Sequence, residues 1–191
     1  MQFLTTILMA TSAMAVAIPS PSQGETLSLE KRESCMAKGG KVTSWTVSDF
    51  VYEAVYTHNT PTKTTNTGTV KFILENSATS YKANCKAKSN KANDFFYGNT
   101  DFDCDVPLKG DSATFTYDRK SGKLGIFQHW SCAKEGGWYE AKGNANIKPK
   151  CNEKKWQNPH YKTGDKTYSS RRVTCEQKSF KVPILEISAV L

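Results

Sequence analysis

The chain has 191 residues, of which 38% are hydrophobic and 23% charged, and its formal net charge at pH 7 is +8. This length is enough for one domain with a real hydrophobic core. No apolar run is long enough for a membrane-spanning helix, so we expect no transmembrane segment. The excess of positive charge favours anionic partners such as cell-wall polymer, lipid headgroups or nucleic acid.

The N-terminal region has the pattern of a secretory leader. Residues 1–17 are apolar, carry no charge and end in Ala15-Val16-Ala17, which fits the cleavage site of a signal peptide. Residues 18–32 are polar, rich in Pro and Ser, and end in the dibasic pair Lys31-Arg32. We interpret them as a pro-segment, with an uncleaved N-terminal tail as the alternative. The sequence thus predicts a secreted, extracellular protein whose single domain is 33–191.

All six cysteines lie in that domain. An even number at wide spacing, after a signal peptide, predicts three disulfides. No Cys-x-x-Cys pair is present, which argues against zinc and thioredoxin-like sites. Spacing alone does not decide how the six cysteines pair.

The first predicted strand covers 42–58 and is rich in β-branched and aromatic residues. The apolar residues up to Val47 alternate in one phase, and those from Phe50 alternate in the other. The phase changes at Ser48 and Asp49. A β-bulge at this point would let both apolar sets face one core.

The rest of the domain consists of short alternating segments separated by turn residues, and no helical period is sustained. This pattern predicts an all-β, single-domain antiparallel β-barrel, or a closely related sandwich. We expect strands at 69–75, 80–86, 112–117, 124–132, 138–147, 168–176 and 180–190, and loops at 59–68 and 149–168.

The region 148–172 holds much of the positive charge: eight Lys and Arg residues against only Glu153 and Asp165. Such a basic loop favours anionic surfaces, although a loop that charge merely keeps soluble has the same composition. An aromatic side chain beside these cations can stack on sugar rings or bases. The candidate binding residues are Lys154, Lys155, Trp156, Arg171 and Arg172.

Signs of catalysis are weak. The three histidines lack metal-binding spacing, so we expect no metal and no cofactor. No Gly-x-Ser-x-Gly motif is present, and three disulfides would leave no free thiol as a nucleophile. A small secreted hydrolase remains the alternative, and a ribonuclease is the best example. It would need a base, an acid and a cation, for which His129, Glu140 and Arg119 are the candidates.

Several segments resemble a known family. They are the opening Trp45-Thr46-Val47-Ser48-Asp49-Phe50, the strand that ends in Cys85, the turn from Asp118 to Gly122, and the closing Val173-Thr174-Cys175. In their order they resemble the fungal secreted effector and elicitor proteins typified by the major allergen of Alternaria. The resemblance implies an antiparallel β-barrel and a non-enzymatic, secreted protein that acts at a host surface.

The resemblance, together with the order of the cysteines, implies the disulfides Cys85–Cys104 and Cys151–Cys175. The pair Cys35–Cys132 is then the one that remains, and it departs from the family pattern. Because Cys35 then has a partner within the chain, we expect a monomer or a weak homodimer. The partners that fit are a host apoplastic protein, a small aromatic ligand, or an anionic cell-wall or membrane surface. Binding without catalysis is therefore the first functional hypothesis.

Overall fold

The computed structural model describes residues 34–90 and 95–190, all within the unit Glu33–Leu191. The expected signal peptide 1–17 and pro-segment 18–32 lie outside the described residues. The described part holds one short helix and nine strands: α1 (Cys35–Gly39), β1 (Ser44–His58), β2 (Thr64–Glu75), β3 (Lys82–Ser89), β4 (Phe102–Asp105), β5 (Ser112–Asp118), β6 (Lys123–Cys132), β7 (Gly137–Asn146), β8 (Lys150–Gln157) and β9 (Ser169–Val190).

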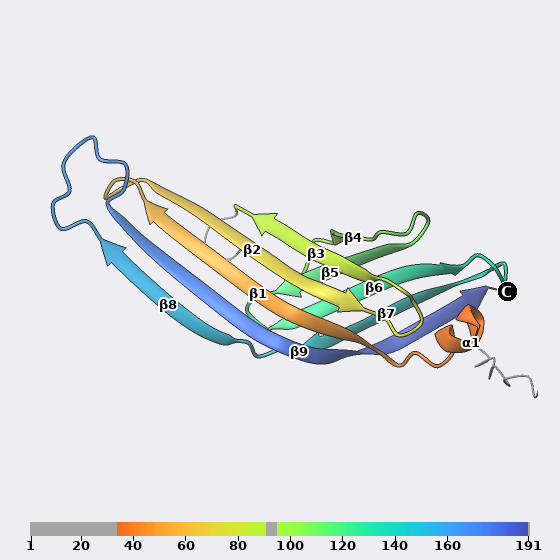
Figure 1. Ribbon diagram of the computed structural model, residues 1–191. Helices are drawn as coiled ribbons and strands as arrows, with labels where there is room; N and C mark the ends of the chain where they lie inside the picture. The colour runs from red at the N-terminus through yellow and green to blue at the C-terminus, as the bar shows by residue number, and fades with distance from the viewer. Residues whose placement is uncertain (1–33, 91–94, 191) are drawn as a thin grey trace, which may run out of the picture. The chain divides into compact units, whose positions relative to one another are not determined.

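Eight of these strands form a closed antiparallel barrel, as predicted. The order runs from β1 to β7 and then to β9, which returns to pair with β1. The long strand β9 makes this closure: its first part, 169–183, pairs with β1, and its last part, 184–190, pairs with β7. The remaining strand, β8, pairs only with residues 169–176 of β9 and lies outside the closed barrel (Figure 1).

The bulge predicted in the first strand is confirmed. The pairing of β1 with β2 shifts between Ser48 and Val51. Asp49 takes a left-handed backbone conformation with φ of 54°, which short polar residues such as Asp tolerate better than most. Because of the shift, Val47 and Phe50 both face the core, and both are fully buried.

Aromatic side chains fill the interior, as is usual for a barrel of eight strands. Phe72 meets Phe115 edge-on with 4.9 Å between ring centroids, and Trp130 stacks on Tyr139 at 5.2 Å. Trp45 is fully buried, and its indole N–H donates to Oε1 of Gln128 over 2.7 Å. These contacts make the barrel a packed scaffold.

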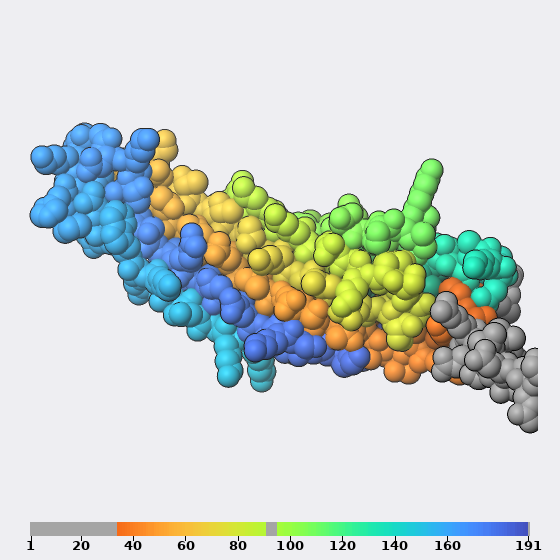
Figure 2. Space-filling model, in the orientation of Figure 1, coloured from red at the N-terminus to blue at the C-terminus, as the bar shows by residue number. Residues whose placement is uncertain are grey.

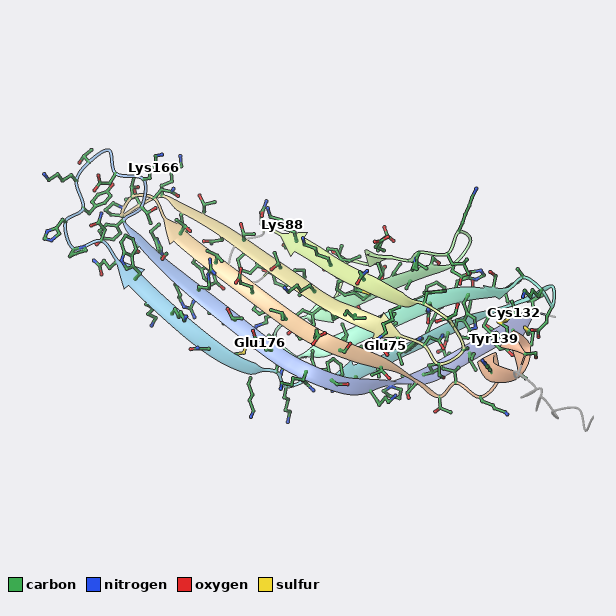
Figure 3. The ribbon with its side chains drawn as sticks, in the orientation of Figure 1. Glu75, Lys88, Cys132, Tyr139, Lys166 and Glu176 are labelled. Carbon is green, nitrogen blue, oxygen red and sulfur yellow. A yellow bond between two sulfur atoms is a disulfide. The ribbon has the colours of Figure 1, made fainter. Side chains whose placement is uncertain are left out.

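The three predicted disulfides are present, and no cysteine is free. Cys35–Cys132 fixes α1 to the end of β6, near Tyr139 (Figure 3). The Tyr139 hydroxyl donates to the carbonyl of Met36 over 2.8 Å. Gly39 lies so close to the Tyr139 ring that an added Cβ would clash with it, so the helix sits directly on this ring.

Three element predictions are wrong. The loop predicted at 59–68 is shorter, since β2 begins at Thr64, and the two last predicted strands are one continuous strand, β9. The loop predicted at 149–168 contains β8. All three corrections arise where the backbone pairs with a neighbouring strand although the side chains show little apolar alternation. Within the described residues, no helix is long and apolar enough to cross a membrane.

Candidate functional site

The strand β8 differs from every barrel strand because all eight of its residues are exposed. Its backbone pairs with β9, and the disulfide Cys151–Cys175 joins the two strands at directly opposed positions. Successive residues of a strand point to opposite sides. Lys154 and Trp156 therefore lie on one face of the β8–β9 pair, and Glu153 and Lys155 lie on the other.

The first face carries an open groove of about 1110 Å3, which we call the β8–β9 groove. Trp156 lines it with 52% of its surface exposed. Figure 2 shows the side chains of β8 projecting from this part of the surface, next to those of β9. The charged residues that line the groove are Lys148, Lys150, Lys154, Lys155, Arg172 and Lys178, with Glu176 as the carboxylate among them.

At one position of this groove two positive charges face each other, whereas Lys150 lies opposite the carboxylate of Glu176. Lys154 lies directly opposite Arg172, an arrangement that is unfavourable unless an anion screens it. Arg172 has one carboxylate within reach, because its guanidinium lies 3.6 Å from Oε2 of Glu53. Among the described residues, Lys154 forms no ion pair. The groove therefore has unneutralised positive charge on a solvent-exposed strand.

On the opposite face of the β8–β9 pair, two cations share one carboxylate. Glu153 accepts from the Arg171 guanidinium over 3.0 Å and lies 3.0 Å from Nζ of Lys155. These two cations, Arg171 first, lower the pKa of Glu153 to about 2. The Arg171 guanidinium also stacks over the ring of Tyr56, 5.0 Å from its centroid.

A smaller groove of about 460 Å3 opens on this second face. Tyr52, Tyr56, Arg119 and Arg171 are among the residues that line it. The Arg119 guanidinium lies 5.0 Å from the centroid of Tyr52, so each arginine is held against a tyrosine ring. These contacts hold both guanidinium groups on the barrel wall.

The five predicted binding residues are thus divided between two faces. Lys154, Trp156 and Arg172 come together in the β8–β9 groove, whereas Arg171 and the ammonium group of Lys155 pair with Glu153 on the other face. Lys148, Lys150 and Lys178 also belong to the site, although they are not among the binding residues predicted from the sequence. Lys148 and Lys150 are in the predicted basic region, but Lys178 joins the groove only through the pairing of β9, which charge counting does not reveal.

The three candidate ribonuclease residues do not come together. His129 and Glu140 are cross-strand partners on β6 and β7, with 3.7 Å between Nδ1 and Oε1. Arg119 lies in the turn before β6, and His129 is six residues beyond the start of that strand, roughly 20 Å away at the usual rise per residue. No group of three or more potential metal ligands is clustered within 34–90 and 95–190.

Comparison with known proteins identifies the family. The family model described as Alternaria alternata allergen 1 matches residues 47–175. Searches of curated proteins and of solved structures found no match. The matched segment begins within β1, ends at Cys175, and includes β8 and seven of the eight β9 residues that pair with it. It spans well over half of the sequence, so the chain belongs to the Alternaria alternata allergen 1 family.

Proposed function

We propose that the protein is a secreted fungal effector or elicitor that acts by binding rather than by catalysis, and that the β8–β9 groove is its contact surface for an anionic partner. Family membership supports an allergen-like fungal protein. The three disulfides are consistent with an oxidising, extracellular environment.

The observation that carries the proposal concerns the strand β8. It contributes no residue to the hydrophobic core, yet it places several positive charges side by side. The residues of β8 are all exposed, yet a disulfide fixes the strand to β9. The resulting groove has five cations against one carboxylate, because the ammonium group of Lys155 pairs with Glu153 on the other face. A surface of this kind attracts anions and raises their local concentration.

The size of the groove bears on the choice of partner. Typical pockets for small ligands have volumes of roughly 300–1,000 Å3 and enclose most of the ligand. The β8–β9 groove is larger, at about 1110 Å3, and open. It suits an extended partner, such as a host protein surface or a polymer, better than a small aromatic ligand.

A pair of matched variants tests the proposal. Lys148→Gln/Lys150→Gln/Lys154→Gln removes three lysines from the groove. Lys71→Gln/Lys86→Gln/Lys88→Gln removes three exposed lysines from β2 and β3, where Lys71 and Lys86 are cross-strand partners. Among the described residues, none of these six lysines forms an ion pair. Both variants therefore have the same net charge and lose no salt bridge.

The measurement is retention on an anionic matrix as a function of salt. We expect the groove variant to bind about tenfold more weakly and the control variant within about twofold of the parent, because exposed contacts that salt screens contribute a few tenths to about 1 kcal/mol each. Equal losses in both variants would mean that net charge alone governs binding, and would contradict the proposal.

Ribonuclease activity is the second candidate, and one observation favours it: the His129–Glu140 pair is present on the outer wall of the barrel. Its test is an RNA-cleavage assay of the parent protein and of His129→Ala. We expect no cleavage. Cleavage that disappears in the variant would replace binding by catalysis as the function.

We also propose that the protein is a monomer or a weak homodimer. Cys35, the cysteine nearest the N-terminus, is bonded to Cys132 of the same chain and so is not available for a bond between chains. Non-reducing electrophoresis should show a single monomer band, whereas a dimer that disappears on reduction would contradict the internal pairing.

A further inference from the structure

We propose that the ligand of the β8–β9 groove is an acidic polysaccharide, a polyuronate chain whose carboxylates meet the lysines of β8 and one of whose sugar rings stacks on Trp156. This inference rests on the proposed function of the groove and specifies the chemical class of the anion.

The arrangement of the cations along β8 matches a linear anionic polymer. Lys150, Asn152, Lys154 and Trp156 share one face of the strand, because alternate residues point the same way. Alternate residues of a strand are roughly 6.7 Å apart. The two lysines therefore stand about 13 Å apart along a straight line, and the indole lies one step beyond the second lysine. An extended chain with a carboxylate on every ring can meet both lysines at once.

Trp156 supplies the site for a ring. It is half exposed although it is the largest side chain of β8, and it lies at one end of the row of lysines. Trp45 and Trp130, in contrast, are fully buried in the barrel. The C–H groups on the face of a sugar ring pack well against the electron-rich face of an indole, while the hydroxyl groups of the sugar stay in water.

Between the charges, the groove has uncharged hydrogen-bonding groups. Asn152, Ser170 and Thr174 line it. Their side chains have no hydrogen-bond partner within the described ranges 34–90 and 95–190. Amide and hydroxyl groups donate and accept, as the hydroxyl groups of a sugar do. A groove that combines cations, short polar side chains and one flat aromatic residue is suited to a charged carbohydrate.

Two other anionic polymers fit less well. Single-stranded nucleic acid is held by several aromatic residues on which successive bases stack, whereas this groove has one. An acidic peptide that extends the sheet would pair with the edge of β8 that has no partner strand in 34–90 and 95–190, whereas Lys154 and Trp156 project from the face of the strand. The surface chemistry therefore favours a uronate chain over both.

The experiment is a titration of the purified protein with oligogalacturonate, with its methyl ester as the uncharged control. Polyglutamate and polyuridylate serve as anionic controls without uronate rings. We expect oligogalacturonate to bind, its methyl ester to bind at least about tenfold more weakly, and the two other polymers to fall between them. The loss on esterification follows from the removal of the carboxylates that face the lysines.

Four variants locate the binding site. Trp156→Ala should weaken oligogalacturonate binding about fivefold, as expected for one aromatic contact, and Trp156→Phe should restore part of it. The same change should leave polyglutamate binding within about twofold. Lys150→Gln/Lys154→Gln should weaken the binding of every anionic polymer, whereas Lys86→Gln/Lys88→Gln should weaken none of them more than about twofold.

The outcomes distinguish a failure of the polysaccharide as ligand from a failure of the anion-binding groove itself. If polyglutamate or polyuridylate binds as tightly as oligogalacturonate and Trp156→Ala has no effect, the polysaccharide is wrong, while the anion-binding groove stands. If no anionic polymer depends on Lys150 and Lys154, both proposals fail. Circular dichroism of each variant confirms that the barrel is intact, since none of the substituted residues is buried.

Discussion

The strands β1 and β8 show how this molecule separates stability from surface chemistry. β1 is paired on both sides, with β2 and β9, and five of its residues are buried. β8 is paired on one side within the described part of the chain, and none of its residues is buried. The comparison indicates that the barrel can tolerate changes on β8 that it would not tolerate on β1.

The tryptophans of these two strands make the same contrast. Trp45 on β1 has no exposed surface and donates a hydrogen bond to Gln128, whereas 52% of the surface of Trp156 on β8 is exposed. One residue type therefore contributes packing energy in the first strand and a contact surface in the second.

The largest expected effect concerns two disulfides, one that fixes α1 to the barrel strand β6 and one that fixes β8 to β9. Replacing both Cys35 and Cys132 by Ala opens a connection with a sequence separation of 97 residues, against 24 for Cys151 and Cys175. In the chain-entropy model the first change lowers the free energy of unfolding by about 4.7 kcal/mol and the second by at most about 3.5 kcal/mol.

Denaturant unfolding of the two double variants gives these values. We also expect the second variant to lose binding at the β8–β9 groove, because β8 has no buried residue to hold it in place. If removing Cys151–Cys175 destabilised the protein more than removing Cys35–Cys132, β8 would be part of the stabilising scaffold, and the contrast with β1 would be wrong.

The next largest expected effect is a difference in stability between variants that lack Trp45 and variants that lack Trp156. Trp45→Ala leaves a large cavity and removes the indole donor from Gln128, so it should lower the free energy of unfolding by about 4 kcal/mol. Trp156→Ala should change it by no more than about 0.5 kcal/mol, because it is an exposed position. Similar losses in urea unfolding would contradict the assignment of Trp156 to binding.

The smallest expected effect is a dependence on pH of the stability that Glu153 contributes. The pKa of Glu153 falls from 4.5 to about 2 in the folded protein, so its ion pairs with Arg171 and Lys155 stabilise the fold fully above pH 4.5. This contribution decreases as the pH falls and is lost near pH 2. The melting temperatures of the parent and of Glu153→Gln should therefore differ slightly at pH 6 and converge near pH 2. A constant difference over this range would mean that the charge of Glu153 does not matter.

The sequence predicts the barrel better than it predicts the site, for a physical reason. Apolar alternation shows which residues face a core, and so it locates β1 and even the bulge at Asp49. β8 has no buried face, so its strand structure follows from pairing with β9 and from the disulfide Cys151–Cys175. The positive charge of residues 148–172 is evident from the sequence, but the placement of Arg171 and Arg172 on two different faces depends on the strand register.

The most direct test of the account is to follow the four tryptophan indole N–H signals by nuclear magnetic resonance while oligogalacturonate is added. Signals of groups at the binding site shift, and those in the packed barrel do not. We expect a progressive shift of the Trp156 signal, with the signals of Trp45 and Trp130 unchanged. A shift of the Trp138 signal on the barrel wall, with Trp156 unaffected, would place binding away from β8 and contradict the account.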